Sequence, residues 1–209
     1  MSDELPLRHR AVWAVLVLVI VGLIGMALWE RAKDSSPPLP VYGQIDDFTL
    51  TNQAGKPMQG SELKGHIWIA DFIFTRCPGM CIIVTGTLSS VNKELKDLAD
   101  LRLVSFSMDP EYDTPEILAA YAEKQGAVLP RWTFLTGPKD VMHALTRDQF
   151  KQAVMEKSGG DQPIIHSNRL VLVDQKGRIR GFYSGEKVES VKELAAAVRK
   201  LAGARQEHD

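Results

Sequence analysis

Two stretches that are apolar on both faces, separated by a segment of helical pattern, constrain the fold of this chain more than any other feature. The first is HIWIADFIFT at residues 66–75, and the second is LRLVSFSM at residues 101–108. Continuous apolar strands of this kind are typical of parallel sheets that are covered on both faces. Between them, Met80–Ala99 carries apolar residues at helical spacing, so the three segments predict a strand–helix–strand unit with parallel strands.

The rest of the domain continues this alternation of strands and helices. Further strands are expected at residues 48–51, 132–135, 169–174 and 178–184, and further helices at residues 114–125, 137–146 and 188–202. A DQKG turn joins the last two strands into an antiparallel hairpin. Residues 147–167 have no periodicity. We therefore predict an α/β fold whose mixed sheet is flanked by helices on both faces.

The first thirty residues are of a different kind. Ala11–Trp29 has no charged residue, and at about 1.5 Å per residue it matches the roughly 30 Å hydrocarbon core of a bilayer. A cleaved signal peptide is the weaker interpretation, because the run is long for one and no small-residue cleavage site follows. The predicted organisation is a cytoplasmic tail at residues 1–10, a transmembrane anchor at 11–29, a Pro-rich linker at 30–42, a folded domain at 43–203 and a tail at 204–209.

The charge of the chain is balanced. It has 25 Lys and Arg residues against 26 Asp and Glu residues, a net charge of −1, and no long block of one sign. Binding to nucleic acid needs a concentrated basic face. We therefore expect no nucleic acid partner.

Cys77 and Cys81 are the only cysteines in the chain. They follow the first buried strand and begin the next helix, at the edge of an α/β sheet where reactive sites collect. The positive end of a helix dipole lowers the pKa of a thiol there. A disulfide that closes so short a loop stabilises a fold little, so a redox-active disulfide or a metal site is favoured over a structural one. Two thiolates are soft ligands that suit Cu(I) first and zinc second.

A site that also holds Cu(II) calls for a third ligand, and the histidines are the candidates. His9 and His208 lie in the terminal segments, and His66 begins a strand at its far end from the cysteines. His143 lies within a helical pattern, where a packed or solvated side chain is the ordinary interpretation. His166 ends the irregular segment and precedes a strand, which makes it the leading candidate.

Other residues near the cysteines are interpreted structurally. Met80 is a soft donor inside the loop, but we expect it to pack into the core. Asp109, Asp113 and Thr114 read as an Asp-Pro turn followed by a helix cap, since carboxylates are poor ligands for Cu(I).

Taken together, these motifs resemble the Sco/SenC family of copper proteins, which serve assembly of the copper centre of cytochrome c oxidase. The likeness covers nearly all of residues 43–203, and its matching stretches are DFIFTRCPGMC at 71–81, SFSMDPEYDTPEIL at 105–118 and IIHSNRLVLVDQKGRIRGFY at 164–183. The resemblance implies a thioredoxin-like fold and a copper site made of Cys77, Cys81 and His166. It also implies transfer of copper to the oxidase subunit that carries the dinuclear copper centre, with other copper chaperones or thiol reductases as further partners.

The chain departs from the family pattern in two places. Ile82 stands where proline usually follows the second cysteine, and the loop is Pro-Gly-Met, without the acidic residue that is common there. We expect these changes to alter copper affinity and redox poise rather than to remove the ligands. They leave open a member specialised for a different oxidase, for thiol reduction or for redox signalling.

The alternative interpretation is a membrane-tethered thiol–disulfide oxidoreductase, which would be an enzyme and has no need of His166. A metallochaperone, in contrast, is not an enzyme. A thiol peroxidase of this fold is disfavoured because Phe74 stands where a threonine is expected. A binding module with an incidental disulfide leaves the position of the cysteines unexplained. Copper handling and disulfide cycling both belong outside the cytoplasm, so we place the domain on the periplasmic side of a bacterial inner membrane.

Overall fold

The computed structural model describes residues 7–34, 38–152, 154–156, 163–165 and 168–206. The chain divides into two units, Met1–Pro38 and Leu39–Asp209. In its described part, the first unit is the helix α1 (Leu7–Asp34), so the helix expected at residues 11–29 is present. Among the residues that the structure describes, no helix combines the length and apolar character needed to cross a membrane. The structure thus confirms the helix, and its role as an anchor stays a prediction.

The second unit is built on an 8-stranded mixed sheet with the strand order β1-β10-β9-β4-β5-β6-β2-β3. The central strands β4, β5 and β6 pair in parallel, while β9 pairs with β4 and with β10 in antiparallel fashion. The bounds of the strands in this sheet are β1 Gly43–Gln44, β2 Thr49–Asn52, β3 Pro57–Gln59, β4 Ile67–Ile73, β5 Leu101–Ser107, β6 Trp132–Thr136, β9 Arg169–Val173 and β10 Arg178–Ser184. The predicted mixed sheet and its parallel centre are confirmed.

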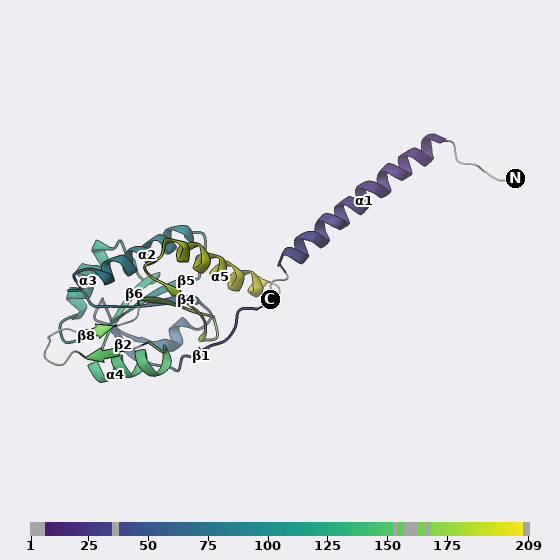
Figure 1. Ribbon diagram of the computed structural model, residues 1–209. Coiled ribbons are helices and arrows are strands. Elements are labelled where there is room, and N and C mark those ends of the chain that lie inside the picture. The colour runs from purple at the N-terminus through teal and green to yellow at the C-terminus, as the bar shows by residue number, and fades with distance from the viewer. Residues whose placement is uncertain (1–6, 35–37, 153, 157–162, 166–167, 207–209) are drawn as a thin grey trace. The chain divides into compact units, whose positions relative to one another are not determined.

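Helices cover both faces of this sheet, as predicted (Figure 1). On one face lie α2 (Met80–Glu94), α3 (Pro115–Lys124) and α5 (Val188–Gln206). On the other face lie α4 (Lys139–Ala144) and the π-helix η2 (Leu145–Gln149), with the 3₁₀ helix η1 (Gly60–Leu63). Two short strands, β7 (Val154–Glu156) and β8 (Pro163–Ile165), form a separate antiparallel pair.

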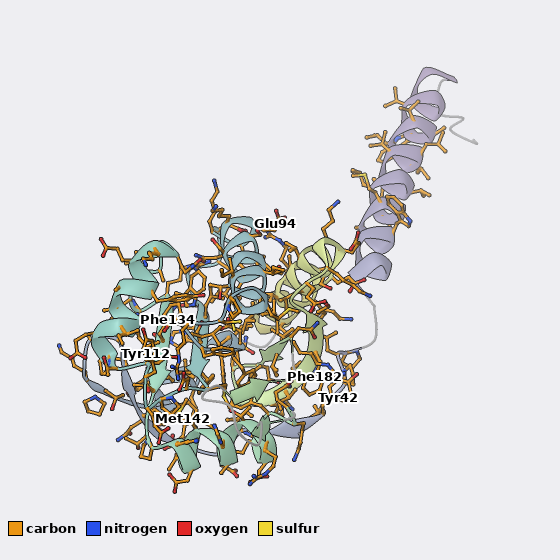
Figure 2. The ribbon with its side chains drawn as sticks, turned by 60° about the vertical axis from the view of Figure 1, so that its left-hand side comes forward. Tyr42, Glu94, Tyr112, Phe134, Met142 and Phe182 are labelled. Carbon is orange, nitrogen blue, oxygen red and sulfur yellow. The ribbon has the colours of Figure 1, made fainter. Side chains whose placement is uncertain are left out.

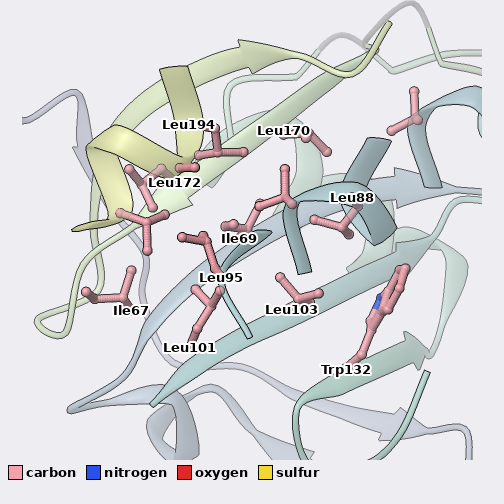
Figure 3. Close-up of a cluster of buried hydrophobic side chains, with 14 of the residues drawn as sticks. Ile67, Ile69, Leu88, Leu95, Leu101, Leu103, Trp132, Leu170, Leu172 and Leu194 are labelled. Carbon is pink, nitrogen blue, oxygen red and sulfur yellow. The ribbon is translucent and has the colours of Figure 1, made fainter. Parts of the chain in front are cut away.

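The apolar run of β4 explains the two cores. Successive side chains of a strand point to opposite faces, so a strand that is buried on both sides is apolar on both, as β4 is except at Asp71. Ile69 and Ile73 pack among the helices α2, α3 and α5. Figure 3 shows Ile69 within this cluster. Trp68 and Phe72 pack on the opposite face with Phe150, where their rings make edge-to-face contacts. All seven residues of β4 are buried.

The structure differs from the predicted elements where distant residues decide the outcome. The helix predicted through Ala99 ends at Glu94, because the following carbonyls of Leu95 and Leu98 accept hydrogen bonds from the guanidinium of Arg131, at 2.7 and 2.5 Å. Residues 147–167, expected to be irregular, contain β7 and β8 in their described part. Neither the hydrogen bonds from Arg131 nor the pairing of β7 with β8 is visible in the local periodicity of the sequence.

Candidate functional site

The two cysteines lie where the sequence predicted, at the junction of β4 and α2. The cysteine loop, by which we mean residues 74–79, connects these elements and holds Cys77, which is half-buried. Cys81 lies in the first turn of α2 and is 6% exposed. The backbone N–H of Cys81 donates to Cys77 Sγ over 3.4 Å, so the sulfur of Cys77 takes the place of an absent side-chain cap at the start of the helix. Both thiols are free and adjacent.

Burial makes the two thiols unequal. Desolvation raises the pKa of the Cys81 thiol, and the neighbouring Cys77 thiol and the charge of Asp71 add to the rise. The expectation that the helix N-terminus lowers the cysteine pKa is therefore wrong for Cys81, because loss of hydration outweighs the dipole there. Cys77 is the sulfur that receives the helix N–H and has access to solvent. The site thus has an accessible sulfur and a buried one.

Asp113 fastens the cysteine loop to the loop that follows β5. Its carboxylate accepts hydrogen bonds from the backbone N–H of Thr75 at 3.3 Å and from the Thr75 hydroxyl. The Ser107 hydroxyl donates to its other oxygen over 2.6 Å. Burial raises the pKa of Asp113, and these donors oppose that rise. Since β4 and β5 run in parallel, the two loops emerge side by side and a single carboxylate can join them.

A second connection joins Arg76 to the same segment. Arg76 Nε donates to Asp109 Oδ2 over 2.6 Å, and its guanidinium lies 4.5 Å from the centre of the Tyr112 ring. Thr114 is the N-cap of α3 and accepts from the Ile117 N–H at 3.4 Å, which confirms the predicted cap. Asp109 and Asp113 do more than form the predicted turn, because both bind the residues that precede Cys77.

Asp71 is a site residue that the sequence analysis missed. It lies in the middle of β4 on the face that carries Ile69 and Ile73, beneath α2, and it is fully buried. Within the described residues, neither of its oxygens has a hydrogen-bond partner. Burial raises its pKa to about 7, and the neighbouring Ser105 hydroxyl opposes this only in part. A single carboxylate inside an otherwise apolar strand was the available signal.

Further polar groups share the buried region under Cys81. The Thr85 and Tyr121 hydroxyls lie 3.2 Å apart, between α2 and α3. Burial raises the pKa of Tyr121 to about 12, and negative charge on Asp71 and on the two cysteines adds to this effect. Trp132 Nε1 donates to Ser105 Oγ over 2.9 Å. The cysteines therefore lie above a buried polar group of residues within an otherwise apolar core.

His166 lies outside the described residues. The chain next to it is described from Asn168, whose carbonyl accepts from the Gly185 N–H at 2.6 Å. The Gly185 carbonyl in turn accepts from Thr87 on α2 over 2.6 Å. Because β9 runs antiparallel to β4, it begins at the edge of the sheet where β4 ends and the cysteine loop starts. Asn168, at the start of β9, therefore lies at the cysteine edge of the sheet and is connected to α2 through Gly185 and Thr87.

The other histidines and Met80 have distinct surroundings. A ring nitrogen of His66 lies 3.2 Å from the Asp100 carbonyl, and one of His143 lies 3.4 Å from the Met108 carbonyl. Met80 is 45% exposed, so its predicted place in the core is wrong: it lies on the outer side of the first turn of α2. In the described part of the chain, no group of three His, Cys, Asp or Glu residues is arranged to hold a metal ion.

The chain is similar to proteins of one family over most of its length. Residues 41–203 match the sequence pattern of the family described as SCO1/SenC. The SCO1 protein homolog of Bacillus subtilis (strain 168) is 35% identical over 148 residues, which cover 70% of this chain and 76% of that protein.

Solved structures agree with this match. A SCO1/SenC family lipoprotein from Bacillus anthracis str. Ames has a TM-score of 0.73 at 33% identity, covering 78% of this chain and 97% of that one. BsSco, described as a member of the Sco family of cytochrome c oxidase assembly proteins with a disulfide switch, has a TM-score of 0.69 at 33% identity, covering 80% and 97%. The α/β thioredoxin-like mixed sheet implied by the resemblance is thus confirmed.

A more distant structure is that of Bradyrhizobium japonicum ScoI with copper bound. Its TM-score is 0.61 at 22% identity, and the match covers 74% of this chain and 99% of that one. At this identity the likeness concerns the fold alone.

Proposed function

Since this chain belongs to the SCO1/SenC family, we propose that it is a copper metallochaperone that binds copper through Cys77, Cys81 and His166. Its partner in this proposal is the copper-carrying subunit of cytochrome c oxidase, whose copper centre it helps to assemble. Copper is its cargo, taken up and passed on rather than kept.

The observation that carries this proposal is the pair of free thiols at the start of α2. The Cys81 N–H donates to Cys77 Sγ, so the sulfur of Cys77 lies directly beside residue Cys81. Two adjacent soft donors suit Cu(I) above other metals. Binding must displace the proton of Cys81, whose pKa is raised by burial, so copper affinity should increase with pH.

The path of the chain supports His166 as the third ligand. Asn168 is held beside α2 through Gly185 and Thr87, and β9 begins at the edge of the sheet where the cysteine loop lies. A histidine two residues before Asn168 is therefore close to the right place along the chain. An imidazole added to two thiolates gives a ligand set that accepts Cu(II) as well as Cu(I).

The proposal includes a location. Copper transfer and disulfide cycling need a compartment where disulfides persist, so we propose that the domain works on the periplasmic side of a bacterial inner membrane. Its relative in Bacillus anthracis is described as a lipoprotein. For this chain we propose attachment through residues 11–29, where the described side chains from Val12 to Met26 are predominantly large, apolar and exposed. Extraction of the full-length protein from membranes by detergent but not by alkaline carbonate would support this attachment.

The test of the proposal is copper binding by the reduced full-length chain, compared with His166→Ala. We expect one tightly bound copper per chain, an absorption band from thiolate to Cu(II), and a changed band with weaker Cu(II) binding in His166→Ala. His143→Ala is the matched control, because it removes a histidine that lies near the same edge of the sheet but outside the proposed ligand set. Weak binding that is equal in all three proteins would refute the copper site.

A second function, thiol–disulfide exchange, is favoured by the unequal exposure of the two sulfurs. The Cys77 thiolate would attack a partner disulfide, forming a mixed disulfide and releasing one partner thiolate. The Cys81 thiolate would then attack Cys77 Sγ, forming the Cys77–Cys81 disulfide and releasing the second partner thiolate. Two electrons and two protons pass to the partner. In Cys81→Ser the mixed disulfide should accumulate, and its absence would refute this order of events.

A further inference from the structure

The outer side of the first two turns of α2 is apolar and exposed. This surface, which we call the α2 face, consists of Met80, Ile82, Ile83 and Gly86. Ile82 and Ile83 are 58% and 50% exposed, and a side-chain atom added at Gly86 would meet no described atom within 4 Å. A single exposed apolar residue is ordinary, but three large ones within four consecutive positions form a patch of the kind that marks interaction sites.

The α2 face also lacks charge. No Asp, Glu, Lys or Arg occurs between Arg76 and Lys93, whereas a stretch of this length at the chain's 24% charged residues would hold about four. Arg76, at the near end, donates to Asp109 over 2.6 Å and stacks on Tyr112. Charge attraction therefore contributes little to recognition on this side of the site.

The α2 face lies near the accessible sulfur of the site, because Met80 and Ile82 flank Cys81, whose backbone N–H donates to Cys77 Sγ over 3.4 Å. It begins three residues after Cys77, whereas Cys81 is turned into the core. A partner sulfur that bonds to Cys77 must approach its Sγ to about 2.0 Å. The polypeptide that carries this sulfur then has to lie against the side chains next to Cys77, and those side chains include the α2 face.

We propose that the α2 face is the docking surface for a protein partner that presents to Cys77 a cysteine flanked by apolar, uncharged residues. The inference rests on the proposed function, in which Cys77 takes part in thiol–disulfide exchange or copper transfer with a partner. It adds the chemical character of the partner's surface. Apolar flanking residues lose water against Ile82 and Ile83, while charged ones would lose hydration without a compensating charge. A lipid surface fits less well, because the α2 face has no Lys or Arg to contact anionic headgroups.

Thiol exchange with model substrates tests the proposal on the full-length reduced chain. The probes are two peptides with one cysteine each, activated as mixed disulfides with thionitrobenzoate, whose flanking residues are leucine and valine in one and glutamate in the other. The variant is Ile82→Asn/Ile83→Asn, which removes apolar surface without adding charge. The matched control is Val128→Asn, at an exposed apolar residue outside the α2 face. Hydroxyethyl disulfide, which is small and neutral, reports the intrinsic reactivity of Cys77.

We expect the natural chain and Val128→Asn to react about tenfold faster with the apolar peptide than with the acidic one, and Ile82→Asn/Ile83→Asn to lose this preference. Hydroxyethyl disulfide should react equally with all three proteins. A preference that survives in the double variant, or equal rates for both peptides in the natural chain, would overturn the proposal. The proposal would also be overturned if both peptides react at equal rates while the natural chain forms a dimer, or binds neutral vesicles, and the double variant does not. The α2 face would then bind a second copy of the chain or a lipid surface. Copper binding, measured in parallel, tests the proposed function separately, since a chain that binds no copper can still show the peptide preference.

Discussion

At the residue scale, Asp71 is the group whose surroundings conflict most with its chemistry. Its carboxyl is fully buried, without a hydrogen-bond partner among the described residues, and its pKa rises to about 7 from an ordinary value of 3.8. Between about pH 4 and pH 7, the Asp71 carboxyl is therefore protonated in the folded protein and ionised in the unfolded chain. The contribution to stability is fully present below about pH 4 and is lost as the pH rises through 7.

We expect Asp71→Asn to remove this dependence. Relative to the variant, the natural chain should lose up to about 4 kcal/mol of unfolding free energy between pH 4 and pH 8, at about 1.4 kcal/mol for each unit of pKa shift. Urea unfolding of both proteins across this range measures the difference. Asp148→Asn, at an exposed carboxyl with a lowered pKa, is the control and should lack the effect. Parallel pH profiles for the natural chain and Asp71→Asn would contradict the assignment.

The two cysteines should differ in reactivity. Cys77 is half-buried with solvent access, whereas Cys81 is 6% exposed and its pKa is raised. We expect Cys77, isolated in Cys81→Ser, to react with iodoacetamide at least about tenfold faster than Cys81, isolated in Cys77→Ser. Mass spectrometry of timed samples gives both rates. Equal rates for the two cysteines in denaturant would show that the difference in reactivity comes from the fold. Equal rates in the folded proteins would refute the predicted difference.

At the scale of elements, the site depends on two loops that the parallel pairing of β4 and β5 brings together. Asp113 accepts hydrogen bonds from both Thr75 and Ser107, so Asp113→Ala leaves several donors unpaired. We expect the variant to lose about 2–3 kcal/mol of unfolding free energy, measured by denaturant titration. Asp97→Ala, which breaks the exposed pair with Arg199, should lose less than about 1 kcal/mol. Similar losses in the two variants would mean that Asp113 does not secure the cysteine loop.

Periodicity predicted the elements whose burial shows in their own residue pattern. The apolar runs of β4 and β5 and the spacing of Val84, Leu88 and Val91 along α2 reflect burial against neighbouring layers, so the pattern in the sequence records the fold. The pair β7–β8 and the early end of α2 depend on contacts between residues far apart in the chain, which leave no periodic trace. The π-helix at Leu145–Gln149 likewise has a pattern that an α-helix would share.

The site was predictable to the same degree. A CxxxC pair at a strand–helix junction carries its own signal, and the structure places both cysteines there. The links from Thr75 and Arg76 to Asp113 and Asp109 span more than thirty residues and follow only from the register of β4 with β5. The exposure of Met80 depends on how α2 is rotated against the sheet, which its sequence alone does not determine.

At the scale of the whole molecule, the second unit includes residues that precede its first strand. Arg180 on β10 forms a buried ion pair with Asp174 at 2.7 Å and donates to the carbonyls of Leu39 and Pro40. Burial opposes ionisation of Asp174, but the hydrogen bonds from Arg178 and Arg180 outweigh it and lower its pKa. Next along the chain, the Tyr42 ring packs on Phe182 with 5.5 Å between centroids (Figure 2). These contacts make residues 39–42 part of the folded domain.

Two shortened chains test this boundary. A chain beginning at Leu39 keeps every contact described for the second unit, so we expect it to unfold with the same free energy as that unit does in the full-length protein. A chain beginning at Gly43 loses the acceptors of Arg180, the bond from Tyr42 N–H to the Ile179 carbonyl and the packing of Leu39, which together should lower the unfolding free energy by about 2–4 kcal/mol. Urea titration followed by tryptophan fluorescence measures both, since Trp68 and Trp132 are buried in this unit. Equal midpoints for the two chains would mean that residues 39–42 only link the units, and that Arg180 is satisfied by Asp174 alone.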